Sequence, residues 1–482
     1  MGFHLGLPIS LYHNRADPSP LILILLHNPH HHSASAMDPA KGVMVMRSVL
    51  WRLNQLADAP GPMWESIYCS RKVAYGCGRH GQKVVEGITL FRSLPDHQDV
   101  TSSMTIRLSA EAIGIVKADL GLGSRSALQP QGFVQAASEG LLVLAVNFSV
   151  HNPSNRGYYL VYDSTDASLY MTPCLPTRLV CSYTPAPVPR RIDGGGSEPQ
   201  LVLLAHPYRS CHPDDEDLLC LCTPAARSPG ITDRLWDIKA LCFPHLHLPG
   251  SFNVQVTFSF QGKVFWADLS RGLAYCELRA ATNSAVQFDF INLPYGYEIH
   301  LDDLPEDGSM EPPEMDRTIG CIGGCIKFIC IDRPRGRSGN WMLRFWTLDL
   351  GRKKWQAEEG LLWKELWEQI DFMGSARLWD VEPRYPVLMP DDTLCLVLED
   401  MRHRRVWSPV DSVEVDRICR FDIFSKTPVW HGKVGHYSIW PVMLPGDFFT
   451  KCYPPSDPRK SQLLGRKRKL QSIVASGSCK AS

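Results

Sequence analysis

The hydrophobic and polar positions of this chain repeat one short pattern four times. Each copy has an apolar run that ends in an aspartate, then a polar gap, then an aromatic residue. The β-branched and aromatic residues of each run suit a pleated, half-buried surface, so each run is expected to be a strand. The aspartates are Asp163, Asp268, Asp349 and Asp422, and the aromatics that follow them by six to eight residues are Tyr170, Tyr275, Trp355 and Trp430.

This pattern predicts a β-hairpin at every copy. An aspartate at a strand end can accept a hydrogen bond from the backbone N–H two residues later and so start a turn. The aromatic then begins the return strand and packs against a neighbouring sheet. Residues 217–222 followed by Trp236 form a degenerate fifth copy.

The spacing of the copies indicates the architecture. Successive aspartates are 105, 81 and 73 residues apart, whereas a four-stranded propeller blade takes roughly 40–50 residues. The copies therefore mark parts of blades that carry insertions. We predict an all-β, β-propeller-like array of antiparallel sheets with five to seven blades, in which the four hairpins occupy equivalent positions.

Helical patterns are few. Apolar residues recur at helical spacing from Leu362 to Ile370 and predict a short helical insertion near 361–371. A weaker pattern from Val43 to Leu56 predicts a helical lead-in over residues 37–57. The 37 prolines, 36 glycines and 13 tryptophans fit many short strands joined by turns better than long helices.

No break in composition divides the middle of the chain, so we expect one β domain over residues 58–452. The N-terminal extension, 1–57, is expected to be largely disordered or to precede the true start, with Met37 as an alternative start. Its apolar run Leu21–Leu26 has six residues, fewer than a secretory core of about 7–15 or a membrane span of about 20. We therefore expect an intracellular protein with no membrane partner, whose cysteines are reduced.

The C-terminal tail, 453–482, is basic. It contains the cluster Arg466, Lys467, Arg468 and Lys469, which is typical of a nuclear import signal and equally of a solvated terminus. The location predicted is cytoplasmic or nuclear. No nucleic-acid partner is expected, because the 50 basic and 50 acidic residues of the chain cancel and no aromatic residue follows Tyr453.

The residues that could bind a metal or act as acids and bases are better explained by structural roles in strands, turns and loops. Cys220 and Cys222, which lie near several histidines, are one residue apart, so they share a face of a strand and do not form a zinc knuckle. Cys321 and Cys325 fit a turn that enters a core strand. The carboxylates of residues 302–307 lie in a Pro- and Gly-bearing stretch, which favours a solvated loop. We predict no catalytic, cofactor-binding or metal residues.

One glycine motif matches the dinucleotide fingerprint G-x-G-x-x-G, at Gly76–Gly81. The chemistry requires a strand before the motif and a helix after it, whose N-terminal N–H groups hold the pyrophosphate. The following residues, 82–90, resemble a strand. We therefore expect a glycine-rich turn between strands and no cofactor.

A family resemblance covers residues 262–400. The matching pieces are Trp266–Leu269 with Gly272, Phe290–Pro294, Arg317–Gly320, Gly324–Phe328, Trp346–Leu348 with Trp355, and Tyr385–Leu388. Together they resemble the plant family called domain of unknown function 1618, which is expanded in grasses. The aspartate hairpins are also similar to blade hairpins of kelch and F-box-associated propellers, although residues 37–56 lack the Leu-Pro-led pattern that opens an F-box. The family resemblance implies no assigned chemistry and no functional residues.

The function expected is that of a non-enzymatic protein-interaction scaffold, because radial β repeats gather loops on two faces of a rigid frame. One alternative is a propeller-type hydrolase with carboxylates in the central channel, and another is a nuclear regulator that acts through the basic tail. Two or more carboxylates, or a histidine cluster, converging in the channel would favour the hydrolase.

Overall fold

A computed structural model gives the architecture of the chain. It divides the chain into residues 1–37 and 38–482, and the described residues all belong to the second unit. The described residues are 43–50, 64–93, 101–123, 128–149, 156–175, 179–181, 187–192, 198–207, 218–224, 235–242, 252–278, 285–299, 312–333, 341–369, 381–389, 392–400, 417–432, 442–445 and 448–449.

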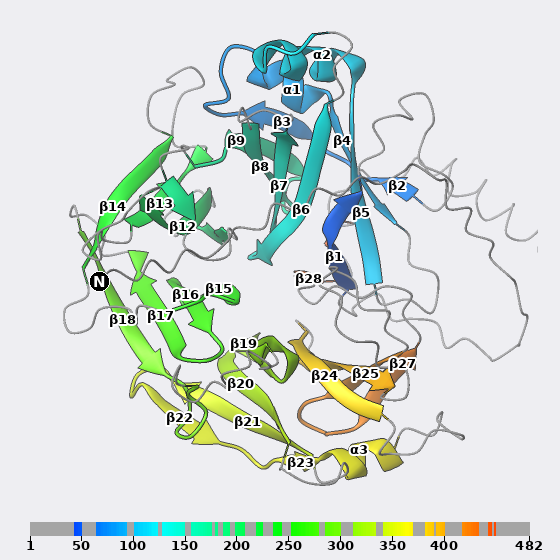
Figure 1. The fold of residues 1–482 in the computed structure, drawn as a ribbon, viewed down its shortest axis with the longest axis vertical. Helices are drawn as coiled ribbons and strands as arrows, with labels where there is room; N and C mark the ends of the chain where they lie inside the picture. The colour runs from blue at the N-terminus through cyan, green and yellow to red at the C-terminus, as the bar shows by residue number, and fades with distance from the viewer. Residues whose placement is uncertain are drawn as a thin grey trace, which may run out of the picture. The chain divides into compact units, whose positions relative to one another are not determined.

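Six antiparallel-rich sheets are arranged in a ring as a six-blade β-propeller, which confirms the predicted fold class (Figure 1). We number the blades along the chain and give their strands from the inside outward. Blade 1 holds β28 (Val442–Leu444), β1 (Val43–Leu50), β5 (Thr101–Leu108), β4 (Ile88–Ser93) and β2 (Trp64–Ser66). Blade 2 holds β6 (Gln129–Ser138), β7 (Leu141–Ser149), β8 (Arg156–Asp163) and β9 (Ser168–Pro173). Blade 3 holds β11 (Val188–Arg191), β12 (Pro199–Pro207), β13 (Leu218–Cys222) and β14 (Trp236–Cys242), and β10 (Leu179–Cys181) also pairs with β12.

The other three blades are four-stranded meanders of the same kind. Blade 4 holds β15 (Val256–Phe260), β16 (Lys263–Asp268), β17 (Gly272–Glu277) and β18 (Ala285–Asn292). Blade 5 holds β19 (Arg317–Ile322), β20 (Cys325–Asp332), β21 (Met342–Asp349) and β22 (Lys354–Ala357), and β23 (Leu361–Leu362) also pairs with β21. Blade 6 holds β24 (Val381–Leu388), β25 (Thr393–Asp400), β26 (Arg417–Asp422) and β27 (Pro428–Gly432).

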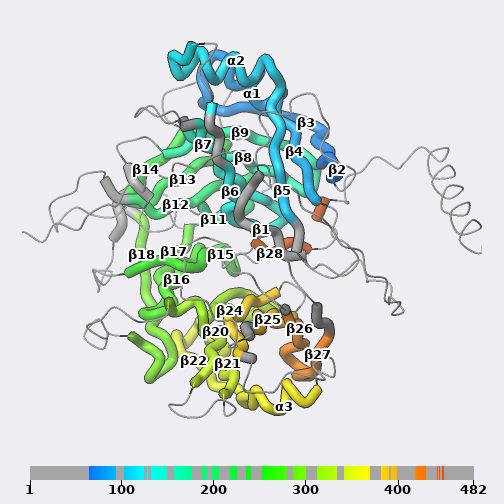
Figure 2. Tube along the Cα trace, turned by 45° about the vertical axis from the view of Figure 1, so that its right-hand side comes forward, coloured from blue at the N-terminus to red at the C-terminus, as the bar shows by residue number. Residues whose placement is uncertain are grey.

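Additional pairings complete the first blade and connect or cover the edges of others. β28 pairs with β1, so the last strand described completes the sheet of the first. β14 and β18, the outer strands of blades 3 and 4, pair in parallel, and β3 (Arg71–Ala74) pairs in parallel with β9 on the outside of blade 2. Figure 2 follows the chain through these strands in order.

The cores lie between adjacent blades, because successive side chains of a strand point to opposite faces of its sheet. In β8, Tyr159 and Val161 pack with blade 3, whereas Leu160 and Tyr162 pack in the core that blade 2 shares with blade 1. The same alternation produces the apolar layers between blades 3 and 4, blades 4 and 5, and blades 5 and 6. The aromatics of the repeated pattern lie in these layers: Tyr170 in that of blades 2 and 3, and Tyr275 and Trp355 in that of blades 4 and 5. The side chain of Trp430 lies outside the described residues.

The aspartates form turns as predicted. Asp163 Oδ1 accepts from the Thr165 N–H at 2.8 Å, Asp268 Oδ1 from Ser270 at 2.7 Å, and Asp422 Oδ1 from Phe424 at 3.0 Å. Asp349 Oδ1 bonds one residue further along, at Arg352, 3.0 Å away.

The predicted equivalence of the four hairpins is wrong for one copy. Asp163, Asp349 and Asp422 end the third strands of blades 2, 5 and 6, but Asp268 ends the second strand of blade 4. Successive hairpins of an antiparallel meander alternate between its two edges, so the Asp268 turn lies on the opposite face of the ring. The pattern predicts a strand that ends in a turn, but it does not specify which hairpin of the blade contains that turn. The degenerate copy does lie in the third and fourth strands of blade 3.

Two of the helical predictions can be tested. The helix near 361–371 is confirmed as α3 (Trp363–Glu368), which buries Trp363 and Leu366. The helix expected from Val43 to Leu56 is wrong over residues 43–50, which form β1, and residues 51–56 lie outside the described residues. Pairing of β1 with β28, β5 and β6 outweighs the weak helical periodicity, and this strand precedes the domain start expected at residue 58. None of the helices in the described ranges has the length and hydrophobicity needed to cross a bilayer.

Candidate functional site

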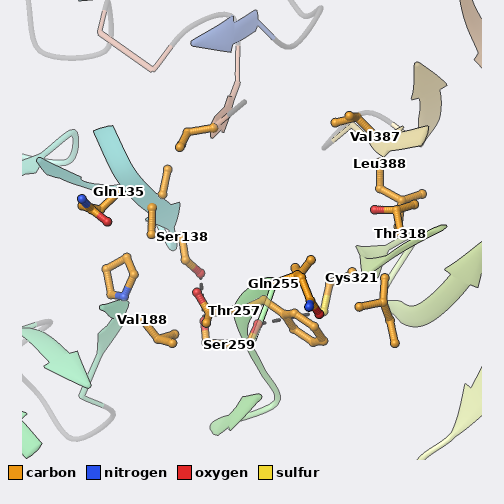
Figure 3. Close-up of a pocket in the computed structure, with 18 of the residues that line it drawn as sticks. Gln135, Ser138, Val188, Gln255, Thr257, Ser259, Thr318, Cys321, Val387 and Leu388 are labelled. Atoms are coloured by element: carbon orange, nitrogen blue, oxygen red, sulfur yellow. Dashed lines mark hydrogen bonds between the residues drawn. The ribbon is translucent and has the colours of Figure 1, made fainter. Parts of the chain in front are cut away.

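The inner strands of all six blades surround a cavity of about 450 Å³. Its wall takes residues from β28, β6, β11, β15, β19 and β24, one strand from each blade (Figure 3). The volume lies within the range of about 300–1,000 Å³ typical of small-molecule sites. This cavity is the candidate functional site.

The wall combines uncharged polar groups with aliphatic ones. β15 contributes Thr257 and Ser259, and Gln255 precedes it. β6 contributes Gln135 and Ser138, and β19 contributes Thr318. The aliphatic part includes Val188, Val387 and Leu388, which lie around these polar groups in Figure 3.

A chain of hydrogen bonds links blades 2, 3 and 4 at one end of the cavity. The hydroxyl oxygens of Ser138 and Ser259 are 2.8 Å apart, and Ser259 donates to Glu139 Oε1 at 2.8 Å. Glu139 Oε2 accepts from the Arg191 N–H at 2.5 Å. Both oxygens of the Glu139 carboxylate are therefore occupied by neighbouring blades.

Arg191 continues this network to Asp163. Its guanidinium donates to Asp163 Oδ1 at 2.7 Å and Oδ2 at 2.9 Å, so blade 3 is joined to blade 2 by a two-point ion pair. Burial raises the pKa of Asp163, but the hydrogen bonds from Arg191 and Thr165 outweigh burial and hold this pKa below its ordinary value. We call Ser138, Ser259, Glu139, Arg191 and Asp163 the collar.

Glu314 and Arg317 line the cavity toward the end opposite the collar. Burial raises the pKa of Glu314, and the nearby Asp268 carboxylate raises it further. Arg317 donates to the carbonyls of Leu269 and Tyr297, at 2.9 and 2.7 Å. Asp268 is only 2% exposed and accepts backbone N–H groups on both oxygens, so it lies behind the cavity wall.

Glu139 and Glu314, the two carboxylates among the described residues of the cavity wall, lie near opposite ends of β19. Glu139 bonds Ser259, whose carbonyl contacts Cys321 Sγ near the end of β19, whereas Glu314 precedes the first residue of that strand. At a rise of about 3.3 Å per residue, the step from Arg317 to Cys321 alone spans about 13 Å. Carboxylate pairs of glycosidases lie about 5–9.5 Å apart. No histidine is among the described residues of the wall.

The cysteines singled out in the sequence lie in strands of blades 3 and 5. Cys220 and Cys222 are buried on one face of β13, as their spacing predicts. Cys321 and Cys325 flank the Gly323–Gly324 turn of the β19–β20 hairpin, also as predicted. Across the ranges that the structure describes, no group of three His, Cys, Asp or Glu side chains is placed to hold a metal. The carboxylates of residues 302–307 and the basic cluster 466–469 lie outside the described residues.

The glycine motif differs from its prediction. Gly76–Gly81 follows β3 and leads into α1 (Gly81–Glu86), so residues 82–86 are helical and the strand β4 begins only at Ile88. A Cβ on Gly81 would lie 2.4 Å from Cys77 Cβ, which explains this glycine by packing. The helix has six residues and β4 pairs antiparallel with β5, so no βαβ unit surrounds the motif.

The cavity residues were not identified from the sequence. A signal exists in Gln255-Val256-Thr257-Phe258-Ser259, where polar and apolar residues alternate as on a strand with one polar face. That alternation does not reveal which strand of a blade faces the ring centre, because this depends on the whole topology.

Known structures show likeness at low identity. The chain is similar to the β-propeller domain of the trilobed protease of Pyrococcus furiosus, with 7% identity, a TM-score of 0.30, and coverage of 63% of this chain and 71% of that one. It is also similar to the NanB sialidase of Streptococcus pneumoniae, with 11% identity, a TM-score of 0.25, and coverage of 58% of this chain and 39% of that one. A third similar structure is AztD of Citrobacter koseri, with 10% identity, a TM-score of 0.23, and coverage of 66% of this chain and 89% of that one. These similarities are too low to carry a functional argument.

The sequence itself has one family match. No curated protein matches the chain. Residues 266–396, which run from β16 to β25, match the model of the family described as "Protein of unknown function (DUF1618)".

Proposed function

We propose that this propeller is a non-enzymatic scaffold that binds another protein through the hairpin tips of blades 5 and 6. The observation that carries the proposal is Phe424, an aromatic side chain that is 64% exposed at the tip of the β26–β27 hairpin. Large aromatic side chains held at a surface are frequent anchors of protein interfaces.

The backbone that carries Phe424 is held in place. Asp422 Oδ1 accepts from the N–H groups of Phe424 and Ser425, at 3.0 and 2.6 Å, and the Lys426 N–H donates to the Asp422 carbonyl at 2.9 Å. Lys426 Nζ also reaches Glu359 at 3.0 Å, which links the tip to blade 5. A side chain presented by a fixed turn loses little conformational freedom on binding, which favours affinity.

The surroundings of Phe424 fit a small interface core with a polar rim. A Cβ on Gly323 would lie 3.3 Å from the Phe424 ring, so this ring lies beside the glycine turn of the β19–β20 hairpin. Val429, 40% exposed, follows on β27. Lys426 and Asp392 supply charges around these apolar groups, as in the rim of a transient interface.

The alternatives have less support. The separation of Glu139 from Glu314 argues against a hydrolase with a carboxylate pair in the channel. A nuclear regulator would depend on Arg466–Lys469, outside the described residues, and a reporter fused to residues 453–482 tests import directly.

Affinity capture with the full chain tests the proposal. Wild type, Phe424→Ala and Tyr295→Ala are used as baits in extract of the source cells, because Tyr295 is a fully exposed aromatic elsewhere on the protein. We expect at least one protein to be recovered with wild type and Tyr295→Ala and to fall about tenfold or more with Phe424→Ala. Equal recovery of every partner by the three baits, with unchanged thermal unfolding, would refute the proposed surface.

A further inference from the structure

We infer that the cavity enclosed by the inner strands is a binding site for a neutral, hydroxyl-rich small molecule, of the size of a mono- or disaccharide. The inference rests on the cavity wall and is independent of the protein-binding surface around Phe424. Three properties of the wall carry it: the hydrogen-bonding groups, the state of the charged groups and the apolar faces.

The hydrogen-bonding groups of the wall can both donate and accept. Ser138, Thr257, Ser259 and Thr318 present hydroxyls from blades 2, 4 and 5 (Figure 3). A hydroxyl offers one donor and two acceptor sites, which is also the pattern of a polyol. Walls of this composition therefore match a ligand whose own groups are hydroxyls.

The collar fixes the direction of two of these hydroxyls. Ser259 donates to the Glu139 carboxylate, so in the contact of 2.8 Å with Ser138 the Ser259 oxygen must accept. Ser138 then donates to Ser259, and its own lone pairs remain as acceptors. A ligand hydroxyl that donates to Ser138 would extend a chain of hydrogen bonds ending on a carboxylate, and such charge-assisted chains are strong.

The amide side chains add complementary groups. Gln255 Oε1 accepts from the Leu269 N–H at 2.8 Å, which leaves its –NH2 group as a donor. Gln135 Oε1 is enclosed and has no hydrogen-bond partner in the structure. An enclosed acceptor without a partner is costly, and rotation of this carboxamide toward a ligand hydroxyl would satisfy it.

The described wall holds more negative than positive side chains, namely the carboxylates of Glu139 and Glu314 and the guanidinium of Arg317. The Arg317 guanidinium donates to two backbone carbonyls, and both oxygens of Glu139 accept from protein donors. A phosphate or another anion placed here would lose its hydration and would face two carboxylates against one guanidinium. The wall therefore favours a neutral ligand over its phosphorylated counterpart.

The apolar part of the wall suits the C–H faces of a sugar ring. Val188, Val387 and Leu388 line the cavity beside the polar groups. Phe258 also lines it, and stacking on Phe265 with ring centroids 5.1 Å apart fixes its orientation. An aromatic side chain of fixed orientation, together with aliphatic, hydroxyl and amide groups, offers both kinds of contact that a pyranose needs.

Saturation-transfer NMR and calorimetry on the full chain test the inference, with glucose and sucrose as probes and glucose 6-phosphate as the charged comparator. We expect at least one neutral sugar to bind with a Kd between about 10 µM and 10 mM, and glucose 6-phosphate to bind at least about tenfold more weakly than glucose. Thr257→Val keeps the shape of the side chain and removes its hydroxyl, and is expected to weaken binding about tenfold. Leu388→Trp, which fills the cavity, should abolish it.

Phe424→Ala is the matched control, since it leaves the cavity intact and should bind sugar as wild type does. Absence of saturation transfer to both neutral sugars at 10 mM would overturn the inference. Sugar binding by Thr257→Val and Leu388→Trp that equals the binding by wild type would also overturn it. So would tighter binding of glucose 6-phosphate than of glucose. Loss of protein partners with Phe424→Ala, without loss of sugar binding, separates this inference from the proposed scaffold function.

Discussion

Removal of the Arg191 guanidinium should weaken the attachment of blade 3 to blade 2. The Asp163 and Arg191 side chains are 5% and 15% exposed, and their closest atoms are 2.7 Å apart. At that distance and an effective dielectric constant of about 20, the attraction is about 6 kcal/mol. Desolvation of the two ions opposes it by several kcal/mol. Because Arg191 keeps some contact with water, we expect Arg191→Ala to lower the free energy of unfolding by about 2–3 kcal/mol.

A double-mutant cycle measures the interaction. Urea unfolding, followed by tryptophan fluorescence, is recorded for wild type, Asp163→Asn, Arg191→Ala and the double variant. The coupling energy expected is about 2 kcal/mol. The matched control is the pair Lys83 and Glu111, which are 3.2 Å apart but 62% and 67% exposed, so their coupling should be below about 0.5 kcal/mol.

The same pair predicts a pH dependence. The folded-state pKa of Asp163 is below its unfolded value of about 3.9, so its stabilising contribution is complete above that value and is lost as the pH falls through the folded pKa. The difference in unfolding free energy between wild type and Arg191→Ala should be constant from about pH 6 to 8 and should shrink below about pH 4. A coupling below about 0.5 kcal/mol, or a difference that does not change in acid, would refute the reasoning.

Three further predictions concern single side chains. Trp363 is fully buried between blades 5 and 6, so Trp363→Ala should lower the free energy of unfolding in urea by about 3–5 kcal/mol, and a loss below about 1 kcal/mol would contradict the described core. Gly272→Ala would place a Cβ 2.2 Å from the Ile291 carbonyl oxygen and should cost more than about 2 kcal/mol, whereas Gly324→Ala meets open space and should cost about 1 kcal/mol; equal costs would count against the turn geometry. Since burial raises the folded-state pKa of Glu314, its charge destabilises the fold at pH 7, so Glu314→Gln should raise stability at pH 7 and lose this advantage as the pH falls to about 4; a variant less stable at pH 7 would show the opposite sign.

Local chemistry made part of this fold predictable. A carboxylate at a strand end bonds the next N–H groups whatever the rest of the chain does, so the turns at Asp163, Asp268 and Asp422 follow from the sequence. The alternation of apolar residues likewise identifies strands that are buried on both faces, as in β8.

The features that were not predicted from the sequence depend on pairing between distant parts of the chain. β1 carries a weak helical pattern, but its partners are near residues 101–105, 132–133 and 442–444, and no local signal announces them. The position of the Asp268 hairpin depends on where blade 4 begins. The cavity residues share this property, because a strand becomes the inner one only through the order of the entire ring.

The parallel pairing of β14 with β18 has a consequence for the behaviour of the protein at high concentration. The outermost strand of a blade presents unpaired N–H and C=O groups, and such edges are templates for aggregation between molecules. In blades 3 and 4 the two edges pair over residues 240–242 and 285–287, and β3 covers the edge of β9 in blade 2. Self-association through strand edges should therefore begin at the rims of blades 1, 5 and 6, where β2, β22 and β27 end their sheets among the described residues.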